Sequence, residues 1–347
     1  MKVNFCTLFN TNYMSRGLVM YDSLIKHCAD FHLYVFAFDD HCFDYLNKKN
    51  LPHLTAISLT DFEDEALLLV KKDRTAAEYC WTSTSSTILY CMEQFNLSNC
   101  TYLDADLQFF SNPLQLIEEM GDNSVLITEH RYSPSYDQSL ESGKYCVQFV
   151  TFKNDDTGMK VLRDWRDDCL EWCYARIEDG KFGDQKYLDA WMSKYKGIHE
   201  LKHLGGGIAP WNVQQYNFRS SERKLIGTNI VDGKDFPVVF FHFHGVQFFD
   251  DDIVSYAGAR YDLNAMIQEL FYEPYIRLLN QKKDEIREQL PDLNPNGSSG
   301  KAPYAPMSFK VKFMIFLSEL KNTSVNRVIP NLKKRISNHY FHYSRKL

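Results

Sequence analysis

Two aspartates one residue apart, Asp104 and Asp106, lie in the otherwise apolar segment CTYLDADLQFF (100–110). Carboxylates that leave water at a strand end lose free energy unless a cation or hydrogen-bond donors offset the loss. Side chains at positions i and i+2 of a strand can reach one divalent ion, and oxygen ligands suit a hard cation. Such an ion would also stabilise a departing diphosphate. Two interpretations stay open: a metal site, or one aspartate that caps the following turn beside a solvated one.

Two histidines at the end of an apolar run, His242 and His244, are further candidate ligands. They end the segment FPVVFFHFHG (236–245), which predicts a buried strand. The two-residue period of a strand would place both side chains on one side. Two aspartates, one histidine and water would form a mixed oxygen and nitrogen site that suits Mn²⁺ or Mg²⁺. The spacing leaves open which histidine binds.

Polar residues that could meet a sugar follow in two glycine-bearing segments. Asp184 and Gln185 come after a glycine at the start of a predicted helix in FGDQKYLDAW (182–191). They could point into a cleft, although Asp184 could also be an N-cap. In HLGGGIAPWN (203–212), the glycines allow close backbone approach and Trp211 offers a flat face for a sugar ring. An ordinary turn with a core tryptophan is the alternative.

The elements that must position these residues alternate between strands and helices. This alternation predicts an α/β fold with a mixed, mostly parallel sheet flanked by helices, in which ligands bind at the carboxyl ends of strands. We expect strands over 3–9, 31–39, 54–59, 101–106, 124–129 and 144–154. We expect helices over 15–27, with Ser15 as the N-cap, and over 43–49, 114–119 and 156–176, with 62–95 largely helical.

Charge is distributed unevenly along the chain. The formal net charge of −6 argues against a nucleic-acid partner. Residues 301–347, however, contain ten Lys and Arg but one acidic residue, Glu319. Basic and apolar residues interleave there, which predicts that a C-terminal extension over 304–347 binds an anionic membrane surface. A packed helix with a solvated basic face is the alternative. The composition of 291–303 predicts a linker before this extension.

Nine cysteines without a CxxC pair indicate a reducing compartment rather than a disulfide framework. The chain starts directly with a predicted strand and contains no apolar run of 18 residues. We therefore expect a cytoplasmic protein that can lie peripherally on the inner face of the plasma membrane.

Four segments, in this order, resemble motifs of nucleotide-sugar glycosyltransferases of the GT-A fold, and within them bacterial relatives of glycosyltransferase family 8. The segments are TLFNTNYMSRG, YLDADLQFFSNP, GDQKYLDAW and FHFHG, and the resemblance covers about residues 1–250. It implies a catalytic domain over 1–290, with a nucleotide-binding half over about 1–130 and an acceptor half over about 131–290.

The resemblance also implies roles for individual residues. Asp104 and Asp106 would hold Mn²⁺ (or Mg²⁺) on the donor diphosphate, with His242 or His244 as a third ligand. A second set would bind the nucleotide sugar: Asn10, Asn12 and Tyr13 at the nucleotide, Asp39 or Asp40 at the ribose or base edge, Asp184 and Gln185 beside the sugar, and Arg74 and Lys144 at the diphosphate or sugar. The implied activity is retaining transfer from a UDP-sugar to a glycan or lipid-linked acceptor in surface polysaccharide or lipopolysaccharide synthesis.

One departure from the family pattern concerns the cation for the diphosphate. Family 8 enzymes continue the histidine–glycine motif with a lysine, whereas this chain continues with Val246 and Gln247. Another cation must then contact the diphosphate. Two other functions remain on the same fold: a sugar-nucleotide pyrophosphorylase, and a sugar-binding protein without catalysis. NTNYMSRG lacks the glycine-rich basic loop of the former, and the aspartate pair argues against the latter.

Overall fold

A seven-stranded sheet forms the centre of the part of the chain that the structure describes, residues 2–221, 224–250, 253–258, 261–301 and 340–342. The structure is a computed structural model, and its strand order is β3-β2-β1-β4-β7-β6-β8. The strands are β1 Val3–Phe9, β2 Phe31–Ala37, β3 Leu54–Ser58, β4 Asn99–Leu103, β6 Val125–Glu129, β7 Tyr145–Lys153 and β8 Ile198–Glu200.

The sheet is mixed and mostly parallel, as the sequence predicts. Strands β3, β2, β1 and β4 pair in parallel, and β6 pairs in parallel with β8. Strand β7 runs antiparallel to both of its neighbours, β4 and β6. This reversed strand brings residues 145–153 beside the end of β4.

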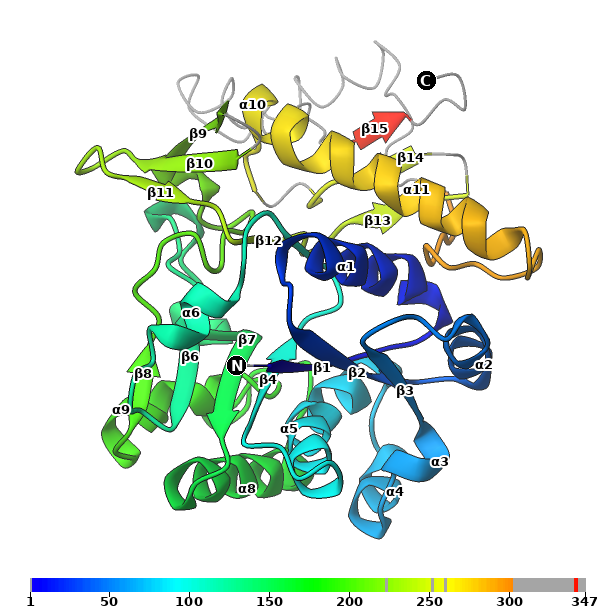
Figure 1. The fold of residues 1–347 in the computed structure, drawn as a ribbon. Coiled ribbons are helices and arrows are strands. Elements are labelled where there is room, and N and C mark those ends of the chain that lie inside the picture. Colours follow the sequence, from blue (N-terminus) through cyan, green and yellow to red (C-terminus); the bar gives the residue numbers. More distant parts are fainter. Residues whose placement is uncertain (1, 222–223, 251–252, 259–260, 302–339, 343–347) are drawn as a thin grey trace, which may run out of the picture.

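Helices cover both faces of the sheet, with α1 (Met14–His27), α2 (Asp40–Lys49) and α11 (Glu273–Arg287) on one side (Figure 1). The other side carries α5 (Ala76–Gln94) and α8 (Asp156–Glu171). Alternate residues of β1 serve the two faces, because successive strand side chains point in opposite directions. Phe5 packs in the apolar cluster with α1 and α2, and Cys6 packs in the cluster with α5 and α8.

Short helical turns connect the long elements. The α-helical ones are α3 Leu59–Phe62, α4 Glu65–Lys71, α6 Leu114–Glu118, α7 Ser139–Ser142, α9 Trp191–Lys194 and α10 Ala265–Ile267. The 3-10 turns are η1 Thr11–Tyr13, η2 Pro134–Tyr136, η3 Lys186–Ala190 and η4 Val213–Gln215, and a π-helical turn spans Gln268–Tyr272.

Three small antiparallel sheets flank the central one. Strands β5 (Leu107–Phe109) and β12 (Phe240–His242) form a pair that is important for the site below. The other two sheets comprise β9 Tyr216–Ser221, β10 Lys224–Asn229 and β11 Asp235–Pro237, and β13 Gln247–Phe248, β14 Ile253–Ser255 and β15 Tyr340–His342. A third apolar cluster, which includes Phe241, Phe243 and Tyr275, joins these sheets to α11.

The prediction of one continuous strand over 236–245 is wrong. The backbone of this apolar run has three partners in turn: β11 pairs with β10, Val239 then donates to the carbonyl of Gly205 (2.9 Å), and β12 pairs with β5. The strand ends at His242, so strand periodicity does not extend to His244.

The predicted N-cap of the first helix, Ser15, is also wrong, because η1 precedes the helix and α1 begins at Met14. The Ser15 hydroxyl instead lies 2.9 Å from the carbonyl oxygen of Pro295 and 2.5 Å from Oδ1 of Asn296. Asn296 is 1% exposed. This part of the predicted linker is therefore packed on the start of α1.

Across the residues that the structure describes, no helix combines the length and the apolar character needed to cross a membrane. The extension over 304–347, for which we predict a membrane surface as partner, lies outside the described residues except for 340–342.

Candidate functional site

The aspartate pair lies at the carboxyl end of a central strand, in the tight connection between β4 and β5. Strand β4 ends at Leu103, and the amide of Leu107 donates to the carbonyl of Asp104 (3.3 Å) to close the connection. The Asp104 side chain is 28% exposed and the Asp106 side chain 12% exposed. Both carboxylates therefore stand at a strand end, where an α/β sheet binds ligands, and Asp104 is the more accessible.

His242 meets this pair because β12 and β5 are adjacent strands. In their antiparallel register His242 lies opposite Leu107, the residue after Asp106. Its Nε2 atom is 3.1 Å from Oδ1 of Asp106 and 3.7 Å from Oδ2 of Asp104. The structure thus brings together the two aspartates and one of the two predicted histidines.

Strand β7 adds two residues that the sequence analysis did not select, Gln148 and Cys146. The β4–β7 register pairs Leu103 with Phe149, and the Asp104 amide donates to the Gln148 carbonyl (3.1 Å). The side-chain Oε1 of Gln148 lies 2.8 Å from Nδ1 of His242. One ligand atom from each of Asp104, Cys146 and His242 lies within 4.8 Å of the other two.

Gln148 orients the imidazole of His242. An amide oxygen can only accept a hydrogen bond, so Nδ1 of His242 must carry a proton and Nε2 faces the aspartates. This arrangement leaves Nε2 as the nitrogen that a metal ion could use. A hydrogen-bonded partner of this kind behind a ligand histidine is a recurrent feature of metal sites.

His242 balances the charge of the two aspartates. Burial alone would lower the pKa of His242, but the Asp106 carboxylate raises it well above its usual range. Burial likewise opposes ionisation of Asp106, yet the charge of His242 and its hydrogen bond lower the Asp106 pKa to about 2. For Asp104, burial dominates and raises the pKa to about 6. The protein therefore holds a positive group where a metal cation would otherwise offset the two carboxylates.

The turn at the start of α1 places Tyr13 and Arg16 beside the cluster. Arg16 is buried, and its guanidinium carbon lies 4.3 Å from the centre of the Tyr13 ring. Its nitrogens donate to the carbonyls of Val246 (2.8 Å) and Asn296 (3.1 Å). Burial raises the pKa of Asp106, whereas the charges of His242, His244 and, more weakly, Arg16 lower it. Tyr13 is 41% exposed, so part of its side chain is accessible to a ligand.

Other predicted nucleotide-binding residues build this turn. The Asn10 side chain accepts a hydrogen bond from the Asn12 amide (3.1 Å). Asp39 accepts from the Thr11 amide (2.7 Å), from the Thr11 hydroxyl (2.6 Å) and, as the N-cap of α2, from the Cys42 amide (2.8 Å). Asp39 therefore ties the ends of β1 and β2 together, whereas Asp40, in the first turn of α2, is exposed.

Asp184 lies near the cluster, on the side of the sheet that α5 covers. Burial, reinforced by the negative charge of Asp104, raises the Asp184 pKa to about 7, and a hydrogen bond with Thr84 of α5 opposes the shift. The carbonyl of Asp184 accepts from the indole of Trp165 (2.9 Å). Asp184 does not cap a helix, because η3 has Gln185 at its N-cap position. The Gln185 side chain donates to the carbonyl of Ser142 (2.6 Å).

Two predicted cationic contacts are engaged elsewhere. The Arg74 guanidinium stacks 3.8 Å from the centre of the Tyr174 ring and donates to the carbonyl of Leu170 (3.4 Å). The Lys144 amine lies 2.6 Å from Oε2 of Glu200 and 3.2 Å from the Tyr145 hydroxyl. These contacts connect Arg74 to the end of α8 and Lys144 to β8 rather than to the aspartate pair.

His244 and Trp211 border the cluster in different ways. His244 is exposed in the turn after β12, and its ring centre lies 5.7 Å from that of His242. Trp211 is 4% exposed, donates to the His130 carbonyl (2.9 Å) and presents its edge to His242. The core interpretation of Trp211 is therefore confirmed. Gly205 packs directly against the Pro237 carbonyl, where a Cβ atom would lie 1.9 Å from the oxygen.

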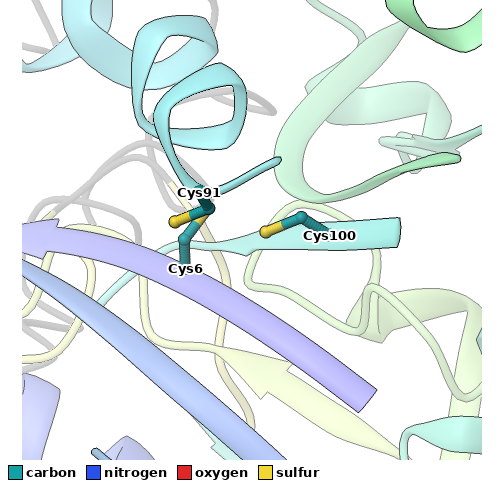
Figure 2. A group of neighbouring side chains, drawn as sticks. All are labelled: Cys6, Cys91 and Cys100. Carbon is teal, nitrogen blue, oxygen red and sulfur yellow. The ribbon is translucent and has the colours of Figure 1, made fainter. Parts of the chain in front are cut away.

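A second group of metal-ligating side chains lies between the sheet and α5. Figure 2 shows Cys6 of β1, Cys91 of α5 and Cys100 of β4 with their sulfur atoms turned toward one another. All three residues are fully buried. Burial raises the pKa values of the Cys91 and Cys100 thiols well above the usual range, so these two are neutral thiols at neutral pH.

Three residues of the site escaped the sequence analysis: Arg16, Cys146 and Gln148. The only sequence signal for the last two is their spacing of two on a predicted strand, and this signal becomes informative once β7 is known to pair with β4. Arg16 lies four residues after Asn12 inside the predicted first helix, which places it over the preceding turn.

Comparison with known proteins identifies relatives in Bacillus subtilis. The chain matches no model of a known protein family. YfnD of Bacillus subtilis strain 168, an uncharacterized protein, is 30% identical over 294 residues, which cover 83% of this chain and 92% of YfnD. YfnF of the same strain, also uncharacterized, is 29% identical over 252 residues, which cover 70% of this chain and 81% of YfnF.

Solved structures with a similar arrangement of elements include three glycosyltransferases. The galactosyltransferase LgtC, in complex with donor and acceptor sugar analogs, has a TM-score of 0.49 and 12% identity over 80% of this chain and 96% of LgtC. The bifunctional WbbM has a TM-score of 0.47 and 11% identity over 83% of this chain and 51% of WbbM. GlyE of Streptococcus pneumoniae TIGR4 has a TM-score of 0.42 and 12% identity over 100% of this chain and 93% of GlyE. Similarity at this level carries no conclusion about the reaction.

Proposed function

We propose that this chain, which belongs to the same family as the uncharacterized protein YfnD of Bacillus subtilis, is a metal-dependent glycosyltransferase with a nucleotide-diphosphate sugar as donor. The observation that carries the proposal is the convergence of Asp104, Asp106 and His242 at the carboxyl end of β4, beside the turn that begins α1. A hard oxygen-rich site next to an open aromatic ring is what a nucleotide diphosphate with its cation requires.

The residues of the cluster fit a divalent cation such as Mn²⁺ or Mg²⁺. Two carboxylates and the Nε2 atom of His242 converge, and the imidazole is held in the required tautomer by Gln148. When bound, the ion would neutralise charge on the leaving diphosphate. His242 rather than His244 is the proposed third ligand, because its Nε2 atom lies 3.1 Å from Asp106 and 3.7 Å from Asp104, whereas His244 is exposed in the turn after β12.

The start of α1 would bind the nucleotide in this proposal. Tyr13 offers its open ring face for the base, and Asp39 holds the turn through its hydrogen bonds to Thr11. Asp40 is the exposed carboxylate that could meet the ribose. Arg16 is the proposed substitute for the lysine that family 8 enzymes carry after the histidine–glycine motif, because its buried charge already acts on Asp106.

Asp184 and Gln185 would contact the transferred sugar. Asp184, with a pKa of about 7, can hold a proton or accept a hydrogen bond near neutral pH. Gln185 is neutral, and a neutral amide beside the anomeric carbon suits retention, in which the departing diphosphate helps to deprotonate the acceptor. A UDP-sugar donor and a saccharide or lipid-linked acceptor of surface polysaccharide synthesis complete the proposal, on the resemblance to family 8.

A thermal-shift screen tests the donor class. UDP-, GDP-, CMP- and dTDP-sugars are added with and without Mn²⁺, and one nucleotide class should stabilise the protein only when the metal is present. Asp104→Asn and Asp106→Asn should remove that shift while leaving the fold intact. A protein that no nucleotide sugar stabilises would contradict the proposal. Nuclear magnetic resonance of the hydrolysed donor would then identify the sugar and the configuration of its anomeric carbon.

The proposed membrane contact is tested separately on the full chain. Vesicles with and without anionic lipid are sedimented with the wild-type protein and with a Lys333→Gln, Lys334→Gln, Arg335→Gln variant. We expect the wild type to sediment with the anionic vesicles and the variant to do so less, by about 1 kcal/mol of binding free energy for each removed charge. Equal sedimentation of the two proteins would refute a role for these charges.

A further inference from the structure

Cys146 is the residue of the cluster that a hard-cation site does not need. Its side chain is 5% exposed, and one ligand atom from each of Cys146, Asp104 and His242 lies within 4.8 Å of the others. Cys146 therefore lies at the border of the third apolar cluster, to which it also belongs, with a carboxylate and an imidazole within reach of its thiol.

The β4–β7 register explains why a thiol is placed there. Gln148 stands opposite Asp104 in the antiparallel pair. Cys146 precedes Gln148 by two residues on β7, and because the strands are antiparallel it lies in the direction in which the chain runs from Asp104 to Asp106. Strand β7 thus supplies an orienting residue and a potential ligand from neighbouring positions on the same edge of the cluster. Both are held by strand backbone, which positions ligands better than a loop does.

We propose that Cys146 is a ligand of the metal ion bound by Asp104 and His242, and that the centre therefore takes ions that accept sulfur, Co²⁺ and Zn²⁺, in preference to Mg²⁺. This inference rests on the metal site of the proposed function. Binding would replace the S–H bond with a sulfur–metal bond and release one proton to solvent. Thiolate, imidazole and carboxylate together favour the softer divalent ions, while an all-oxygen set favours Mg²⁺.

Titration of the metal-free, full-length protein with Co²⁺ tests the proposal directly. A bound thiolate gives a sulfur-to-cobalt charge-transfer absorption in the near ultraviolet, which oxygen and nitrogen ligands do not give. We expect this band at one equivalent of Co²⁺ in the wild type and its loss in Cys146→Ser. We also expect Cys146→Ser to weaken Co²⁺ binding by about tenfold or more while changing Mg²⁺ binding by less than about threefold.

The buried trio Cys6, Cys91 and Cys100 is the other possible source of such a band, and Cys91→Ala is the matched control. Retention of the band in Cys91→Ala supports Cys146 as the source. A band that survives Cys146→Ser, or that disappears in Cys91→Ala, overturns the proposal. If Cys146→Ser does not fold, the wild type with ¹¹³Cd²⁺ decides, because a thiolate ligand shifts the cadmium resonance strongly downfield and its absence overturns the proposal.

Failure of this inference is distinguishable from failure of the transferase proposal. Co²⁺ bound at one equivalent, as measured by equilibrium dialysis, without the charge-transfer band overturns the role of Cys146 but leaves the metal site intact. A band that depends on Cys146, in a protein that no nucleotide sugar stabilises, supports the thiolate ligand and contradicts the transferase.

Discussion

One strand, β4, contributes to both clusters of metal-ligating side chains, and the two clusters differ in almost every other respect. Cys100, near its start, faces two further thiols between the sheet and α5 (Figure 2). Asp104, just beyond its end, faces a carboxylate, an imidazole and a thiol. The first cluster is wholly buried, whereas the Asp104 side chain is 28% exposed.

The difference shows what converging ligand atoms need in order to be a functional site. The neutral thiols of Cys91 and Cys100 cost little to bury, since neutral thiols behave as small apolar groups. Burial opposes ionisation of the third thiol, but its hydrogen bonds with Cys100, Cys91 and Thr87 lower the pKa of Cys6 to about 5. The Asp104–Asp106–His242 cluster contains two carboxylates and a histidine that must be paired or neutralised. Solvent reaches the second cluster and not the first, so an ion could exchange there without opening the core. We therefore expect the trio to be structural and the polar cluster to bind metal.

The largest expected effect comes from Asp106→Asn. Loss of this carboxylate removes the partner 3.1 Å from His242 and one proposed metal ligand. We expect turnover with the stabilising donor to fall by about 100-fold or more and the metal-dependent thermal shift to vanish. The control variant is Cys91→Ala, which should keep both the turnover and the metal-dependent thermal shift. Loss of turnover in Cys91→Ala and its retention in Asp106→Asn would reverse the assignment of the two clusters.

A smaller loss is expected from Gln148→Leu. This change keeps the approximate side-chain size but removes the acceptor that lies 2.8 Å from Nδ1 of His242. Metal affinity should fall by about 10–100-fold, as for other partners of metal-bound histidines, with a near-normal melting temperature. Gln148→Glu, which restores an acceptor, should recover most of the metal affinity. Isothermal titration calorimetry with the metal ion measures the affinity of both variants. Unchanged affinity in Gln148→Leu would mean that the imidazole is oriented by other contacts.

Cys91→Ala should affect stability alone. Removing a fully buried thiol from a packed core leaves a small cavity and should lower the free energy of unfolding by about 1–2 kcal/mol. Denaturant unfolding measures this loss, and the Co²⁺ titration should match that of the wild type. A change in metal affinity would show that the two clusters are coupled through β4.

The smallest effect is expected from Asn296→Ala. This change tests whether the segment packed on the start of α1 stabilises the residues beside the polar cluster. Asn296 lies 2.5 Å from the Ser15 hydroxyl and 3.3 Å from Oδ1 of Asn280. Loss of these buried contacts should cost about 1 kcal/mol of unfolding free energy. Because the backbone of Asn296 also accepts from Arg16, we expect a modest weakening of nucleotide binding with unchanged Co²⁺ affinity. Stronger nucleotide binding would contradict this role.

The sequence predicts the first half of the fold well because its signals are local. The strand over 3–9, the helix over 15–27 and the strand over 124–129 can be read from periodicity, and the structure has them within one or two residues at each end. The break of 236–245 into β11 and β12 is less evident from periodicity, since the run is apolar on both sides of the break and its local mark is Pro237, which ends β11 and has no amide hydrogen to donate.

The candidate site was predictable where its residues adjoin a strong motif. Asp104, Asp106 and His242 follow apolar runs that end in polar residues, which is a local pattern. Cys146 and Gln148 have no such mark, because their relation to Asp104 depends on the antiparallel β4–β7 pairing. The engagement of Arg74 with Tyr174 is likewise a tertiary contact between positions that the sequence does not connect.

The contact between Ser15 and Asn296 affects when the start of α1 can reach its final packing during synthesis. The two residues are 281 positions apart, yet the hydroxyl of Ser15 and the guanidinium of its neighbour Arg16 both depend on that segment for their partners. At about 5–20 residues per second, a ribosome supplies Asn296 on the order of 15–60 s after Ser15. Helix α1 therefore gains these partners only after most of the described chain has been synthesised.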